Sequence, residues 1–114
     1  MAITETKNLV TQREVFEKCA DIVNDPAARV EHPTNTGHYL VCYKNKKVFE
    51  IYRYDSTLYI RINGVMFDSL TGEDRKFVSE LYDRVDTKYA EQENSRNLNA
   101  LNFLKSCALE KQKQ

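Results

Sequence analysis

The stretch that decides the fold is residues 38–67, which read HYLVCYKNKKVFEIYRYDSTLYIRINGVMF. Within it, Asn63-Gly64 is a strong hairpin signal, because both positions of a two-residue turn need a positive φ. A turn there opposes Ile62 to Val65 and predicts an antiparallel hairpin. Apolar and polar residues alternate on both sides of this turn, as they do in strands with one buried face.

Two more turns extend the hairpin to a four-stranded meander. A two-residue turn at Asp55-Ser56 opposes Tyr52 to Tyr59, and one at Asn45-Lys46 opposes Tyr39 to Tyr52. The three turns together predict one apolar face, which consists of Leu40, Cys42, Phe49, Ile51, Ile60, Ile62, Val65 and Phe67. Arg53 is the charged exception on this face, and a long side chain near a turn can reach outward to water.

The opposite face collects the tyrosines. The predicted register places Tyr39, Tyr52 and Tyr59 side by side across three strands, next to a row in which Glu50 faces Arg61. Tyrosine and arginine are enriched among the residues that dominate protein interfaces. The sequence therefore predicts a partner-binding face made of Tyr39, Tyr43, Glu50, Tyr52, Tyr54, Tyr59 and Arg61. Two structural alternatives remain: the tyrosines stabilise the sheet by cross-strand packing, or the last helix covers them.

Helices are expected on both sides of the meander. Before it, Thr11-Gln12-Arg13-Glu14 forms a capping box that predicts a helix ending at Asn24-Asp25-Pro26. Residues 24–37 contain both prolines and are expected to be irregular, or to include one helical turn around 27–30. After the meander, Thr71-Gly72-Glu73-Asp74 begins a second helix. No Gly or Pro follows Gly72, so the C-terminal part forms two helices or one long bent helix.

The last helical segment is apolar on more than one side, and such a helix needs burial on two sides. It packs against the sheet or it forms a homodimer, and we favour the homodimer. The residues expected at a dimer contact are Leu98, Leu101, Phe103 and Leu104. The predicted fold is α+β, with an N-terminal helix, a four-stranded antiparallel β-meander and two C-terminal helices. Residues 1–9 form a flexible N-terminus, 10–110 a single domain and 111–114 a polar tail.

Composition narrows the class of protein. The 114 residues include 17 basic and 17 acidic ones, and this balance argues against a protein that coats duplex nucleic acid. Three widely spaced cysteines do not form a disulfide framework, and we expect buried free thiols in a reducing compartment. The N-terminus shows no signal-peptide pattern and no apolar run is long enough to cross a bilayer, so we expect a cytoplasmic protein without membrane contact.

No catalytic or cofactor motif is present in the sequence. His38 and Cys42 lie four residues apart on one strand, roughly 13 Å, which is too far for a nucleophilic pair. His32 and His38 lack the spacing of a zinc site, and three glycines cannot form a phosphate-binding loop. We therefore expect neither cofactor nor metal, and a protein that is not an enzyme.

The sequence thus favours a small non-enzymatic protein-binding module, a regulator or inhibitor that occupies the surface of a partner protein. Small phage-encoded inhibitors of host proteins offer a fold-level analogy only. The first alternative is a single-stranded nucleic-acid-binding protein that uses the same face and the basic turn at Lys44, Lys46 and Lys47. The second is a small ligand-binding domain with a pocket between sheet and helices.

Overall fold

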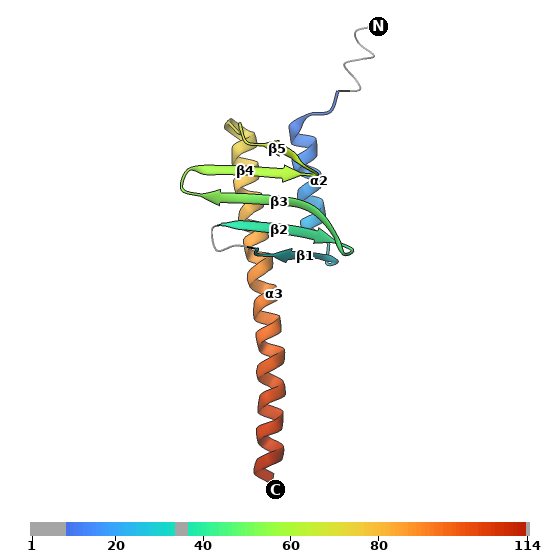
Figure 1. The fold of residues 1–114 in the computed structure, drawn as a ribbon, viewed down its shortest axis with the longest axis vertical. Coiled ribbons are helices and arrows are strands. Elements are labelled where there is room, and N and C mark those ends of the chain that lie inside the picture. The colour runs from blue at the N-terminus through green and yellow to red at the C-terminus, as the bar shows by residue number, and fades with distance from the viewer. Residues whose placement is uncertain (1–8, 34–36, 114) are drawn as a thin grey trace.

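The computed structural model describes residues 9–33 and 37–113, and only the backbone of residues 109–113. Two helices lie on one face of a five-stranded antiparallel sheet, with strand order β1-β2-β3-β4-β5 (Figure 1). The elements are α2 (Gln12–Asn24), β1 (Ala28–Glu31), β2 (His38–Tyr43), β3 (Lys46–Tyr54), β4 (Thr57–Ile62), β5 (Val65–Phe67) and α3 (Gly72–Lys113). The predicted α+β class is confirmed. Of the expected flexible segment 1–9, residues 1–8 lie outside the described residues.

The capping box at the start of α2 is confirmed. The hydroxyl oxygen of Thr11 accepts a hydrogen bond from the backbone N–H of Glu14 at 3.2 Å, and the Glu14 carboxylate accepts one from the Thr11 N–H at 3.3 Å. At the other end, the Asp25 carboxylate accepts a hydrogen bond from the Ala27 N–H at 2.8 Å. The capping-box bonds satisfy N–H groups that the start of the helix leaves free, and the Asp25 bond stabilises the turn that leads into β1.

The prediction of a mostly irregular connection over residues 24–37 was wrong at Ala28–Glu31, which is an edge strand paired with β2 and not a helical turn, and residues 34–36 lie outside the described residues. Ala28 and Val30 are buried, and Arg29 and Glu31 between them are exposed. The sheet therefore has five strands and not four. A four-residue strand with two apolar side chains offers too short an alternation to be recognised, and its partner strand is more distant in sequence than that of a hairpin.

The registers of the last three strands are confirmed. Glu50 faces Arg61 and Tyr52 faces Tyr59 between β3 and β4, and Arg61 faces Met66 between β4 and β5. Asn63 and Gly64 both have the positive φ that their turn required, 49° and 82°, whereas at the Asp55-Ser56 turn only Asp55 does, with a φ of 53°.

The predicted register between β2 and β3 was wrong by one residue. The turn consists of Lys44 and Asn45, and a bulge with Val48 as the extra residue brings Val41 opposite Phe49. Tyr39 and Val41 therefore point to the core, while Leu40 and Cys42 lie on the other face. The sequence of β2 is apolar on both faces, so alternation alone does not determine its register.

The core lies between the sheet and the two helices. Its fully buried members are Phe16 and Val23 of α2, Val41, Phe49, Ile51 and Ile60 of the sheet, and Val78 and Val85 of α3. Arg53 lies at the margin of this layer, where its guanidinium is 4.1 Å from the ring centre of Tyr82 and 2.9 Å from the Asp83 carboxylate.

The C-terminal part of the chain is one helix, the second of the two predicted alternatives. It has 42 residues and is about 63 Å long. Its first half packs on the sheet through Val78, Leu81 and Val85, and its second half continues alone past the edge of β1 (Figure 1). The expected polar tail, 111–114, continues this helix as far as Lys113.

Candidate functional site

The candidate site is the face of the sheet turned away from the helices, which we call the outer face. Both described helices lie behind the sheet in the view of Figure 1, so within the described residues no helix covers it. Strand alternation places on it Arg29 and Glu31 of β1, His38, Leu40 and Cys42 of β2, Glu50, Tyr52 and Tyr54 of β3, Tyr59 and Arg61 of β4, and Met66 of β5.

Three aromatic rings form a stack across the outer face. The rings of His38 and Tyr52 are 3.9 Å apart between centroids and 10° from parallel, and those of Tyr52 and Tyr59 are 4.3 Å and 18°. His38 occupies the place that the sequence predicted for Tyr39, because the bulge at Val48 shifts β2 by one residue. The predicted tyrosine row therefore exists with histidine as its third member.

Glu50 holds this stack together. Its carboxylate accepts a hydrogen bond from the Tyr52 hydroxyl at 2.9 Å and lies 3.0 Å from His38 Nε2. Partial burial favours a higher pKa for Glu50, but these two hydrogen bonds and the nearby charge of Arg61 outweigh it, so the pKa is lowered. Burial and the bond to the carboxylate raise the pKa of Tyr52 to about 12. Two rings are thus fixed by one ionised group.

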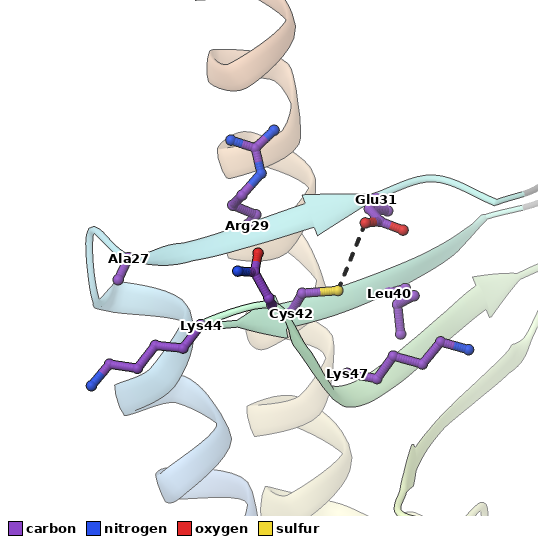
Figure 2. Close-up of a pocket in the computed structure, with 8 residues that line it drawn as sticks. Ala27, Arg29, Glu31, Leu40, Cys42, Lys44 and Lys47 are labelled. Carbon is purple, nitrogen blue, oxygen red and sulfur yellow. Dashed lines mark hydrogen bonds between the residues drawn. The ribbon is translucent and has the colours of Figure 1, made fainter.

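A basic hollow of about 340 Å³ adjoins the stack at the β1–β2 end of the outer face (Figure 2). Arg29, Lys44 and Lys47 contribute to its lining, and Glu31 is the acidic residue there. The ammonium group of Lys44 points away from the hollow, toward the ring of Tyr43 at 5.4 Å from its centre (Figure 2). The thiol of Cys42 donates a long hydrogen bond, 3.8 Å, to the Glu31 carboxylate. Burial first, and then the negative charge of Glu31, raise the pKa of Cys42, which keeps it a thiol rather than a nucleophilic thiolate.

A second hollow, of about 210 Å³, continues the first toward β4. The two hollows share Leu40 and Lys47 in their linings, and the second reaches Glu50 and Arg61. The outer face therefore consists of an aromatic stack along one side and a shallow, mainly basic depression along the other.

Of the seven residues predicted for the partner-binding face, the structure places five on the outer face and two on the core side of the sheet. Glu50, Tyr52, Tyr54, Tyr59 and Arg61 all lie on the outer face, and Tyr54 is 54% exposed. The predictions for Tyr39 and Tyr43 as partner contacts were wrong in position, because both belong to the core side of β2. Tyr39 is buried and donates a short hydrogen bond to Asp86, and Tyr43 donates one to Asp25 at 3.1 Å.

Sequence reasoning missed His38, Leu40 and the β1 residues Arg29 and Glu31. Their place on the outer face depends on the bulge and on an edge strand, and neither has a local sequence signal. Lys44, Lys46 and Lys47 lie exposed around the first turn as expected. Of the three cysteines, Cys19 is buried as predicted, but Cys42 lies half-buried on the outer face and Cys107 is exposed.

Among residues 9–33 and 37–113, no group of three or more His, Cys, Asp or Glu side chains is arranged to hold a metal ion. None of the helices in the described part of the chain combines the length and apolar character that a bilayer crossing demands. No family model, curated protein or solved structure matches the chain. The outer face is therefore the feature of the chain that bears on its function.

Proposed function

We propose that the chain is a non-enzymatic protein-binding module, a cytoplasmic regulator or inhibitor that occupies a partner protein through its outer face. One observation carries this proposal. The stack of His38, Tyr52 and Tyr59, with the facing pair Glu50 and Arg61, stands on a sheet surface that both described helices leave uncovered.

The fixed conformation of these side chains favours binding. Side chains that are already fixed by stacking and by hydrogen bonds to Glu50 lose little conformational entropy when a partner arrives. Tyrosine rings offer apolar area together with a polar hydroxyl, which suits a protein surface of mixed character. The stack therefore resembles a preorganised interface centre.

The charges around the stack indicate what the partner presents. Arg29, Lys44, Lys47 and Arg61 border the two hollows, against Glu31 and Glu50. Glu50 is engaged by His38 and Tyr52, and Glu31 by Cys42. The complementary surface is an apolar or aromatic patch with acidic residues at its rim.

The basic turn favours single-stranded nucleic acid as the second candidate, since lysines meet phosphates while bases stack on aromatic rings. The stacking geometry favours a protein. Of the six ring faces in the stack, one of His38, both of Tyr52 and one of Tyr59 are occupied by each other, and His38 is itself buried. A strand of stacked bases needs free ring faces, whereas a protein can pack on ring edges and hydroxyl groups.

The test compares variants of the outer face with a control on the helical layer. We expect the wild-type protein and Lys18→Glu, whose side chain is exposed on α2, to retain the same partner from a lysate of the source organism. Tyr52→Ala/Tyr59→Ala and Arg61→Glu should each lose it while their thermal transitions stay cooperative. Retention of the partner by both outer-face variants would contradict the proposal.

Nucleic acid is tested separately. Binding of a single-stranded oligonucleotide would weaken steeply with added salt, because phosphate contacts release counterions. Such binding, abolished by replacing Lys44, Lys46 and Lys47 with Ala, would favour the second candidate.

A further inference from the structure

In the second half of α3 the described structure packs no core on the helix; Ser95, Arg96 and Asn99 only line a shallow hollow shared with Ala28 and Arg29 of β1. From Asn94 to Ala108 every side chain is exposed, and this segment projects beyond the edge of β1 (Figure 1). We call residues 94–108 the projecting segment. It carries four large apolar side chains with high exposure: Leu98 at 49%, Leu101 at 47%, Phe103 at 66% and Leu104 at 61%.

This sequence is poorly suited to stand alone as a helix. Helices in water are marginal unless a face of them is packed, even when their residues favour helix. The projecting segment contains Asn94, Asn97, Asn99 and Asn102. Asparagine has a lower helix propensity than the residues common in exposed helices. A packed neighbour would supply the stability that the propensities do not.

The apolar residues lie on two sides of the helix. At about 100° per residue, Leu98, Leu104 and Ala108 all lie within about 60° of Leu101. This leucine stripe, defined by Leu98, Leu101, Leu104 and Ala108, points away from the sheet. Phe103, by contrast, follows Val85 by five full helical turns and so shares the direction of the core-facing residues.

The distribution of charged residues along the helix favours one way of covering the leucine stripe. In the sequence, Glu91 and Glu93 lie before the stripe with Arg96, which pairs with Glu93, and Lys105, Glu110, Lys111 and Lys113 lie toward the C-terminal end of the helix. Two copies in opposite directions place the glutamates of one end near Lys111 and Lys113 of the other copy, and Arg96 near Glu110. Two copies in the same direction place lysines beside lysines. They also place the glutamates that precede the stripe beside each other.

We propose that the projecting segment packs antiparallel against the same segment of a second copy of this chain. The contact is centred between Leu101 and Leu104, so that Leu98, Leu101 and Leu104 of both copies form one apolar cluster. This inference does not depend on the proposed function, because it concerns a different surface and a partner of known sequence.

The arrangement has a consequence for the outer face. In each copy the sheet packs on the part of α3 that precedes Asn94. In the antiparallel pair, the two sheets therefore lie beyond opposite ends of the paired segments. The dimer therefore carries two outer faces that point to separate partners or to two sites on one assembly. Two linked sites raise the apparent affinity for a partner with repeated epitopes without any new contact.

Sedimentation equilibrium over a concentration series tests the pairing. We expect twice the monomer mass for the wild-type protein and the monomer mass for Leu101→Ser/Leu104→Ser. Phe103→Ser is the control, since it removes an even more exposed apolar side chain from the other side of the helix, and it should remain a dimer. A monomeric wild-type protein, a higher oligomer or a monomeric Phe103→Ser variant would overturn the proposal.

Folding is controlled within the same variants. The substituted residues make no part of the core between sheet and helices, so the thermal transition of that core should persist in Leu101→Ser/Leu104→Ser. A double variant that is monomeric because it is unfolded would lack this transition. In that case the single variant Leu101→Ser replaces the double variant in the sedimentation experiment. We expect it to raise the dissociation constant of the dimer at least tenfold.

Disulfide trapping tests the direction. In a Cys107→Ser background, oxidation of a mixture of Asn97→Cys and Ala108→Cys copies should cross-link the two, because the antiparallel contact brings these positions together. Asn97→Cys alone should stay uncross-linked, since its two copies lie about 16 Å apart along the axis and a disulfide spans less than about 7 Å. Efficient cross-linking of Asn97→Cys alone would mean a parallel pair and would overturn the antiparallel proposal.

Discussion

Gln92 of α3 binds the backbone of Val30 as a neighbouring strand would. Its side-chain carbonyl oxygen accepts a hydrogen bond from the Val30 N–H, and its amide nitrogen donates one to the Val30 carbonyl oxygen, both at 2.8 Å. Val30 is in β1, the edge strand, and open edges of sheets recruit other strands. The helix thus closes the edge at the point where it leaves the sheet.

The first prediction concerns this closure. Gln92→Leu removes both hydrogen bonds and should lower the free energy of unfolding by about 1–3 kcal/mol. Urea denaturation measures the change, and light scattering after prolonged incubation detects association through the opened edge. Glu91→Leu introduces the same residue at the neighbouring exposed position and should change the stability little. Equal stability of the two variants would contradict a role for the Gln92 side chain.

The second prediction concerns Gly37, which has a φ of 65° and whose carbonyl oxygen accepts a hydrogen bond from the Arg53 N–H at 3.0 Å. A Cβ atom here would lie 2.1 Å from the Arg53 carbonyl oxygen, so Gly37→Ala must displace backbone. Gly72→Ala is the matched control, because Gly72 also has a positive φ but open space around it. We expect Gly37→Ala to be less stable than Gly72→Ala by about 1–3 kcal/mol in urea denaturation. Equal losses would show that the positive φ alone matters.

The third prediction tests the register of β2. Tyr39 is in the core, so Tyr39→Ala should cost about 3–5 kcal/mol, in the range measured for large buried aromatic residues. Tyr52→Ala removes a ring from the outer face and should cost less than half of that. The register with a turn at Asn45-Lys46 would place both tyrosines on the outer face, and it would be supported if the two variants lost similar stability. Chemical denaturation of both variants under one condition makes the comparison.

The difference between these registers shows how far the sequence could lead. The turns at Asp55-Ser56 and Asn63-Gly64 are short and contain residues that tolerate a positive φ, so they determined which side chains of β3, β4 and β5 share a face. Glu50, Arg61, Tyr52 and Tyr59 could be placed for that reason. The position of His38 could not be predicted. It depends on the bulge at Val48, which places Tyr39 and Val41 in the core and has no signal in the local sequence.

The same limit applies to the elements at the ends of the fold. β1 is stabilised by β2 and by the side chain of Gln92, which follows Val30 by 62 residues. Such a contact between distant parts of the chain has no local signal. The continuous helix α3 could be listed as an alternative because Gly72 is the last glycine or proline. The point at which α3 leaves the sheet is set by the edge of the sheet. Strand β1 forms this edge and was not predicted, so that point could not be predicted either.

The fourth prediction concerns pH and Glu50. The pKa of Glu50 is lowered in the folded protein from the ordinary value of 4.5, which the unfolded chain retains. A lowered folded pKa contributes stability that is present above the unfolded pKa and is lost as the pH falls through the folded pKa. Wild-type protein should therefore exceed Glu50→Gln in free energy of unfolding at pH 6, and this difference should shrink as the pH is lowered toward 3. Glu17→Gln, at an exposed position of α2 beyond its first turn, gives the background pH dependence. A difference between wild type and Glu50→Gln that stays constant from pH 6 to pH 3 would mean that the ionised carboxylate does not hold the stack of His38 and Tyr52.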